Sequence, residues 1–195
     1  MFFEKLKNYN VLLASNSKRR HELLNQLGVQ YKIINQNVDE SFSNELKGSM
    51  ITDYLAKKKS SLLVNNLKKN DILITSDTIV WHKNSPLGKP KNRTEAFKMI
   101  KSLENSSHEV ITSICISTVN FQTIVNEKTL VFFDSIDEND LLYYTKTSDV
   151  LDRAGSYGIQ DYIGHVGITK IEGSYNNVLG FPTNLFVKTS KSMNL

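Results

Sequence analysis

The chain has 195 residues, a formal net charge of +4 and one cysteine. This length suits a single domain over residues 1–195, or two closely fused lobes without a separable linker, and it allows a substantial core. The lone cysteine excludes an intrachain disulfide, and no run approaches the roughly 20 apolar residues that cross a bilayer. We therefore expect a soluble protein of the cytoplasm that makes no membrane contact.

The mildly basic charge suits an anionic ligand. Lysine, asparagine and isoleucine are frequent along the whole chain, so the charge balance does not by itself indicate nucleic acid. The sequence has no zinc-ligand spacing and no aromatic–basic RNA motif, and we expect no nucleic-acid partner. Cys115 lies between two isoleucines in an apolar run, which favours a buried structural thiol over a nucleophile.

Near the N-terminus, four apolar residues at 11–14 predict a short buried strand that is followed at once by Ser15 and Ser17. Ser17 is then the expected N-cap of a helix that stops at Gly28. The apolar positions of this helix share one face: Leu23, Leu24 and Leu27.

The first turn of this helix carries Lys18, Arg19 and Arg20, which oppose the helix dipole. An anion bound there would reverse that effect, because the helix N-terminus also offers free backbone N–H groups. The stretch therefore indicates a phosphate site. The alternative is a solvated basic face that follows an ordinary serine cap.

The next segments are a strand at residues 30–35, a polar loop with Asp39 and Glu40, and a helix at residues 49–67. The apolar side of this helix is expected to comprise Met50, Ile51, Tyr54, Leu55, Leu62 and Leu63. Helical spacing places Lys59 within that stripe, whereas Lys57 and Lys58 are more easily solvated. A lysine with a buried stem and an exposed ammonium would give the same pattern.

A buried strand at residues 71–75 is expected to end at Ser76-Asp77-Thr78, with an extended segment at 79–81 and a turn at 84–86. Asn92 is the expected N-cap of the helix that follows, and Glu95 completes a capping-box-like arrangement. The remaining helices and strands predicted are a helix at 93–103, strands at 109–119, 121–125 and 129–134, a helix at 137–146, strands at 166–171 and 175–179, and a helix at 182–187. Together they predict a mixed α/β sheet flanked by helices.

Asp77 is the sharpest candidate for chemistry, since open α/β sheets place ligands beyond the carboxyl ends of strands. Alone it would be taken as a turn former. Glu40, Lys59 and Lys89 change that assessment, because paired carboxylates and several cations are the parts that phosphoryl transfer needs. Walker, nucleophile-elbow and His-x-x-x-His patterns are lacking, and His108 is expected to be a structural hydrogen bonder.

The motifs taken together resemble the Maf family in order, from about residue 11 to residue 187. They are Leu13-Ala14-Ser15-x-Ser17-x-Arg19-Arg20, Val38-Asp39-Glu40, Ser76-Asp77-Thr78-Ile79-Val80, Gly88-Lys89-Pro90, His108-x-Val110-x-Thr112, Asp152-x-Ala154-Gly155-x-Tyr157-Gly158-Ile159-Gln160 and Gly173-Ser174-Tyr175-x-x-Val178-x-Gly180-x-Pro182. Each motif is weak, but seven in the right order are very specific.

The resemblance implies a nucleoside triphosphate pyrophosphatase with a mixed elongated sheet, two lobes with a substrate cleft between them, and a homodimeric state. It implies a divalent metal, Mg²⁺ or alternatively Mn²⁺ or Co²⁺, held by Glu40 and Asp77. Asp77 would accept the proton of the attacking water, and Lys59 and Lys89 would contact phosphates. The triphosphate cradle would comprise Ser15, Ser17, Arg19 and Arg20.

Three positions resemble the subgroup that acts on dTTP and UTP: Arg19, Thr78 and Gln160. The chain departs from the family pattern at Lys18, Val150 and Arg153, which puts fine specificity in question. Two alternatives stay open. One is a pyrophosphatase of the 7-methyl-GTP subgroup or of other nucleotides, and the other is a non-catalytic nucleotide-binding regulator of septum formation.

Overall fold

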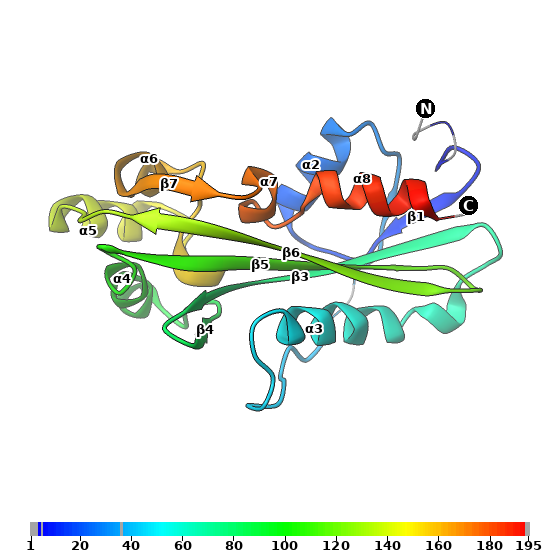
Figure 1. Cartoon of the computed structure of the whole chain (residues 1–195), viewed down its shortest axis with the longest axis horizontal. Coiled ribbons are helices and arrows are strands. Elements are labelled where there is room, and N and C mark those ends of the chain that lie inside the picture. Colours follow the sequence, from blue (N-terminus) through cyan, green and yellow to red (C-terminus); the bar gives the residue numbers. More distant parts are fainter. Residues whose placement is uncertain (1–3, 5, 36, 194–195) are drawn as a thin grey trace. The chain divides into compact units, whose positions relative to one another are not determined.

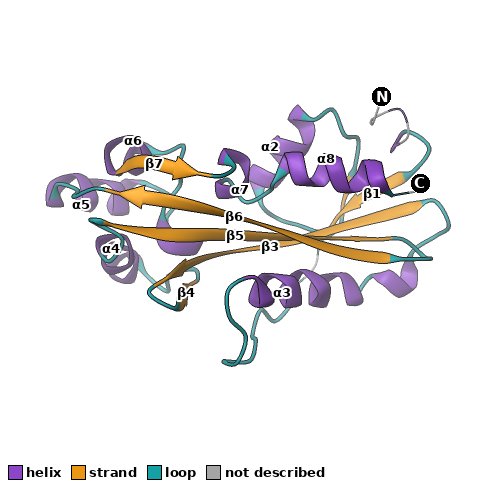
Figure 2. Cartoon of the chain, viewed as in Figure 1, coloured by secondary structure: helices purple, strands orange, loops and turns teal. Residues whose placement is uncertain are grey.

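A seven-stranded sheet runs through the computed structural model, which describes residue 4, residues 6–35 and residues 37–193. The strand order is β2-β1-β3-β5-β6-β7, and β4 pairs with β3. β1 (Asn10–Leu13) is parallel to β2 (Lys32–Ile33) and to β3 (Asp71–His82), whereas β3 and β4 (Ser85–Leu87) are antiparallel. The prediction of a mixed α/β sheet flanked by helices is confirmed (Figure 2).

The chain divides into two compact units that share the long strands β3, β5 (Ser106–Ser117) and β6 (Gln122–Phe133). The first unit is formed by Met1–Asp77, Thr112–Glu127 and Gly180–Leu195. The second is formed by Thr78–Ile111 and Lys128–Leu179. The expected substrate cleft stays a prediction.

In the first unit, α3 (Ser49–Ser61) lies on one face of the sheet, and α2 (Lys18–Gln26) and α8 (Thr183–Ser192) lie on the other (Figure 1). α3 buries Ile51, Leu55 and Lys59, which are spaced by four residues and therefore share one face. The predicted apolar side of this helix was partly wrong, since Met50, Tyr54 and Leu62 are exposed. The helix ends at Ser61 and a separate 3₁₀ turn follows at Val64–Asn66.

The predicted end of the strand at Ser76 was wrong, because β3 continues without a break to His82. Asp77 therefore lies within a strand. The parallel partner β1 ends much earlier, at Leu13 opposite Ile74, so Asp77 still lies beyond the carboxyl end of the parallel pair. The turn comes at Lys83 and Asn84, whose positive φ angles of 46° and 61° suit a tight two-residue hairpin into β4.

In the second unit, α4 (Arg93–Lys101) begins at its predicted cap, and α5 (Glu138–Thr147) begins within one residue of its predicted start at 137. Asn92 Oδ1 accepts a hydrogen bond from Glu95 N–H at 2.9 Å. Two predictions were wrong here: β6 is one strand instead of two, and residues 175–178 form the helix α7 (Tyr175–Val178) instead of a strand. The Ser174 hydroxyl caps α7 by accepting from Asn177 N–H at 3.2 Å.

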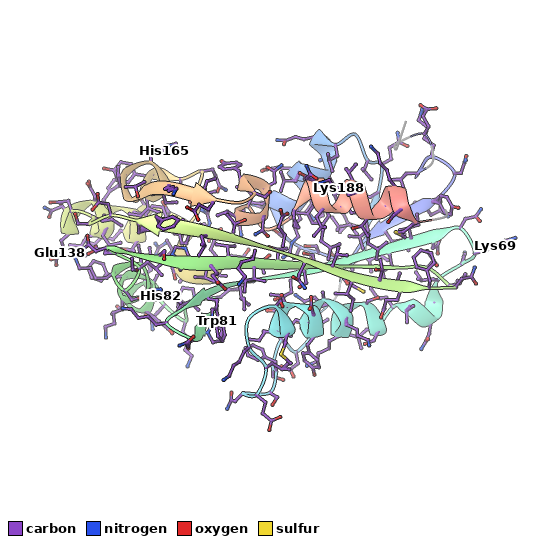
Figure 3. All side chains as sticks on the ribbon, in the orientation of Figure 1. Lys69, Trp81, His82, Glu138, His165 and Lys188 are labelled. Atoms are coloured by element: carbon purple, nitrogen blue, oxygen red, sulfur yellow. The ribbon has the colours of Figure 1, made fainter. Side chains whose placement is uncertain are left out.

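The core of the second unit packs around the sheet, α4, α5 and α6 (Tyr162–Gly167). β7 (Ile168–Glu172) closes this part of the sheet beside β6. His82 and Trp81 are neighbours near the end of β3, and His82 is buried (Figure 3). Cys115, on β5 in the first unit, is buried with a free thiol, as expected. No helix among the described residues is long and apolar enough to span a membrane.

Candidate active site

The turn between β1 and α2 lies where the sequence predicted a phosphate site. Ser17 occupies the N-cap position of α2, but its hydroxyl makes no capping hydrogen bond. The Ser17 N–H instead donates to Ser15 Oγ at 3.2 Å. The first turn of α2 contains no acidic residue, so no carboxylate of that turn offsets the positive end of the helix dipole. This turn has the charge and the hydroxyl groups that an anion needs.

Asp77, Lys59 and Glu40 meet in the first unit, although they come from a strand, a helix and a loop. Lys59 Nζ lies 2.5 Å from Asp77 Oδ1 and 2.8 Å from Glu40 Oε1. Lys59 and Asp77 are buried, with exposed fractions of 9% and 7%, whereas Glu40 is half exposed. The structure thus brings together three of the four residues expected to be catalytic.

Burial dominates the electrostatics of Asp77. Removal from water raises the pKa of the Asp77 carboxyl above its usual 3.8, and the nearby positive charges of Lys59 and Arg20 oppose that rise. Glu40 adds a smaller effect that also raises the pKa of Asp77. A carboxylate with this balance is a better proton acceptor than an exposed aspartate.

Arg20 is held by backbone groups. Its Nε donates to Gly180 O and its Nη1 to Ser76 O, each at 2.9 Å, and Nη1 lies 3.5 Å from Ser15 Oγ. The adjacent His21 was not expected to take part, yet its Nε2 lies 2.9 Å from Ser15 O and its ring stacks on Tyr31. Its only sequence signal is its place in the first two turns of α2, one turn after Ser17.

Arg19 is half-buried on α2 and belongs to the first unit. The remaining expected site residues belong to the second unit. Thr78 follows Asp77 on β3 and is partly buried. Lys89 is exposed and forms an ion pair with Asp152, Nζ to Oδ1, at 2.6 Å. Gln160 is exposed and lies just before α6.

Contacts within the second unit hold the segment that carries Gln160. Tyr144 OH donates to Asp161 Oδ2 at 2.8 Å and accepts from Gly158 N–H at 3.1 Å. Arg153 pairs with Asp161 and leaves no room for a Cβ at Gly158. Sequence reasoning missed Tyr144 and Asp161, because neither stands out without its spatial partners.

The sheet order and the helices define a class of α/β fold that is also found in the Staphylococcus aureus Ham1 protein. The two structures align with a TM-score of 0.53 over 93% of this chain and 98% of that protein, at 14% identity. A family model described as "Maf-like protein" matches residues 10–193, and the chain belongs to the Maf family.

Two relatives match nearly the whole chain. A protein of Christiangramia forsetii named "dTTP/UTP pyrophosphatase" is 48% identical over 99% of this chain and 98% of its own length. A protein of Flavobacterium johnsoniae with the same name is 46% identical over 94% of each chain.

Proposed function

We propose that this protein hydrolyses dTTP and UTP to the nucleoside monophosphate and pyrophosphate. The observation that carries the proposal is the buried Asp77–Lys59 pair with Glu40 beside it, in the unit that also holds the Ser15–Ser17 turn. The names of the relatives, which match nearly the full chain, support the choice of reaction and of nucleotide.

In the proposed reaction, a water oxygen attacks the α-phosphorus and Asp77 accepts the proton that the water loses. The bond from the α-phosphorus to the oxygen that bridges to the β-phosphate breaks, and that oxygen leaves with the pyrophosphate. Lys59 favours the ionised form of Asp77 and can neutralise charge on the phosphates in the transition state. The Ser15–Ser17 turn and Arg19 bind the phosphate chain.

A divalent cation fits Glu40 and Asp77. Oxygens of both carboxylates already converge on one cationic group, the Lys59 ammonium, at 2.8 and 2.5 Å. The described residues contain no group of three or more His, Cys, Asp or Glu side chains that could hold a metal. Two carboxylates suit Mg²⁺, which commonly binds through one or two carboxylates and substrate phosphates. When bound, Mg²⁺ or a similar ion would neutralise phosphate charge.

The second unit is proposed to select the nucleotide. The Gln160 amide offers one donor and one acceptor, which matches the edge of uracil or thymine. Thr78 is proposed to take part in the same recognition. Lys89 is proposed to contact phosphates, exchanging its exposed partner Asp152 for the substrate.

The state of assembly and the location of the protein are proposed from the family resemblance. We propose a homodimer in the cytoplasm, with residues 1–195 acting as one domain. Sedimentation of the purified protein would test the dimer.

The decisive experiment is pyrophosphate release by the purified protein with Mg²⁺ or Mn²⁺ across normal and modified nucleoside triphosphates. We expect turnover that favours dTTP and UTP. A preference for 7-methyl-GTP would keep the chemistry and refute the proposed specificity. Tight nucleotide binding without turnover under either ion would refute the enzyme and favour a nucleotide-binding regulator.

A further inference from the structure

We propose that Arg20 is a positioning residue that fixes the backbone at Asp77, and that it is not a ligand of the triphosphate. The inference rests on the proposed function, because it assigns a role within that same site. It separates Arg20 from Arg19, with which the sequence groups it in the phosphate cradle.

The first argument is the edge of β3 that faces β1. Along this edge, Asn70 O accepts from Asn10 N–H at 2.8 Å, and Ile74 O accepts from Ala14 N–H at 3.0 Å. The next carbonyl toward Asp77 on the same edge is Ser76 O. β1 has ended by then, and Arg20 Nη1 donates to Ser76 O at 2.9 Å. The guanidinium therefore takes the place of the strand that is missing there.

This replacement matters for Asp77 because of peptide planarity. Ser76 C=O and Asp77 N–H belong to one rigid peptide plane, so a bond to Ser76 O fixes the orientation of that plane. The plane leads directly to the Cα that carries the carboxylate. Arg20 thus acts on Asp77 through the backbone as well as through its charge, whereas Lys59 contacts the carboxylate directly.

The second argument is the other anchor of the guanidinium. Arg20 Nε donates to Gly180 O, a residue with φ of 101° that precedes α8. The planar guanidinium therefore connects the middle of β3 to the segment that leads into α8. Only arginine can present two donors in this fixed geometry, since a lysine ammonium is a point charge on a flexible stem.

A clamp and a phosphate ligand differ in the kinetic parameter that they control. Loss of a clamp disturbs the alignment of Asp77 with the water, which lowers kcat; misplacement by about 1 Å can cost about 10²-fold. Loss of a phosphate ligand weakens nucleotide binding, which raises KM. A lysine would replace much of the charge of a phosphate ligand but not the geometry of a clamp.

The test compares Arg20→Lys and Arg20→Gln with the matched neighbour variant Arg19→Lys, using UTP and a non-hydrolysable UTP analogue. For both Arg20 variants we expect kcat to fall by about 10²-fold. We expect KM and the Kd of the analogue to change by less than about threefold, since binding groups remain. Arg19→Lys should instead keep kcat and raise KM only modestly, because a lysine retains much of the charge of a phosphate ligand. If Arg20→Gln does not fold, Arg20→Lys still decides.

The inference is overturned if Arg20→Lys retains near-normal kcat, or if the Arg20 variants mainly raise KM and Kd. Hydrogen exchange keeps the test independent of catalysis. Amides of residues 74–78 should exchange faster in Arg20→Gln than in the wild type, and unchanged exchange contradicts the clamp. If the wild-type protein turns over no nucleotide, the proposed function fails, and hydrogen exchange alone decides the role of Arg20.

Discussion

Each unit of the molecule buries a pair of titratable side chains, and the two pairs are built in opposite ways. In the first unit, Lys59 Nζ and Asp77 Oδ1 lie 2.5 Å apart and carry opposite charges. In the second unit, the rings of His82 and His108 lie 6.4 Å apart between centroids. His108 Nε2 is 2.6 Å from Tyr157 OH, but His108 Nδ1 and both nitrogens of His82 have no partner among the described residues.

Burial therefore has different consequences in the two units. Removal from water disfavours any charge, so it raises the pKa of Asp77 and lowers the pKa of His108 to about 3. Positive neighbours counteract this effect at Asp77, whereas the nearby His82 reinforces it at His108. A paired buried charge suits chemistry. The neutral His108 imidazole suits a core that must stay uncharged, and the predictions below test this contrast.

The largest expected effect is on catalysis by Asp77→Asn. The amide cannot accept the proton of the attacking water, so kcat for UTP should fall by about 10²- to 10⁴-fold. Pyrophosphate release at saturating UTP measures the loss. Turnover close to that of the wild type would remove Asp77 from the proposed mechanism.

Asp71 provides a matched control, because it is a second buried carboxylate on the same strand. It accepts from Asn10 Nδ2 at 3.1 Å and from Lys68 N–H at 2.9 Å, which is a structural role. Asp71→Asn should lower the free energy of unfolding by about 1 kcal/mol, since a hydrogen bond to a charged group is weakened. Its kcat should stay within about twofold of the wild type.

The next effect concerns substrate choice and belongs to the second unit. Gln160→Glu replaces a side chain that can donate and accept with one that only accepts. The kcat/KM for UTP should fall by about 10- to 100-fold, since one base contact would lose its partner. Competition between UTP and guanine nucleotides measures the change. An unaltered preference would show that Gln160 does not read the base.

The fold was predictable where local signals were strong. The apolar run at 11–14, the N-cap position Ser17 and the cap Asn92 each lie where the pattern placed them. Polar residues inside long strands misled the prediction. Ser76-Asp77-Thr78 and Asn126-Glu127-Lys128 look like strand ends, yet both strands continue because β3 pairs with β5 and β5 pairs with β6 in the sheet.

The candidate site was predictable as a set of residue types but not as a set of contacts. Helical spacing placed Lys59 on the buried side of α3, which is confirmed. No local signal reveals that its ammonium would meet Asp77 and Glu40, or that Arg20 would bond to Ser76 O and Gly180 O. Those contacts join segments up to 160 residues apart, so they depend on the tertiary fold.

A smaller effect is the dependence of stability on pH that His108 confers. In the native protein His108 stays neutral down to about pH 3, whereas an unfolded histidine takes up a proton near pH 6.5. The unfolded state then binds more protons, so stability falls as pH drops below 6.5, by about 1.4 kcal/mol per pH unit. Urea unfolding at pH 7 and pH 5 measures this loss.

The control for this prediction removes both partners of the buried hydrogen bond. The double variant His108→Phe, Tyr157→Phe should lose about 2 kcal/mol less than the wild type between pH 7 and pH 5. The remaining titratable groups are the same in both proteins, so the difference between the two losses of unfolding free energy isolates the contribution of His108. Equal losses would mean that His108 is not kept neutral by burial.

The smallest expected effect separates two neighbouring lysines of α3. Lys59 is buried between two carboxylates, whereas Lys58 Nζ contacts Asp39 Oδ2 at 3.4 Å and Ser41 O at 3.2 Å at the surface. Exposed ion pairs contribute little, because water and salt screen them. Lys58→Ala should therefore lower kcat/KM by less than about threefold, through looser placement of Glu40.

Added salt should reduce the difference in kcat/KM between Lys58→Ala and the wild type, because salt screens the Lys58–Asp39 ion pair that only the wild type has. A loss of kcat/KM as large as that caused by Lys59→Ala would contradict this prediction. It would mean that the loop around Glu40 depends on the contacts of Lys58 as much as on the Lys59–Glu40 ion pair.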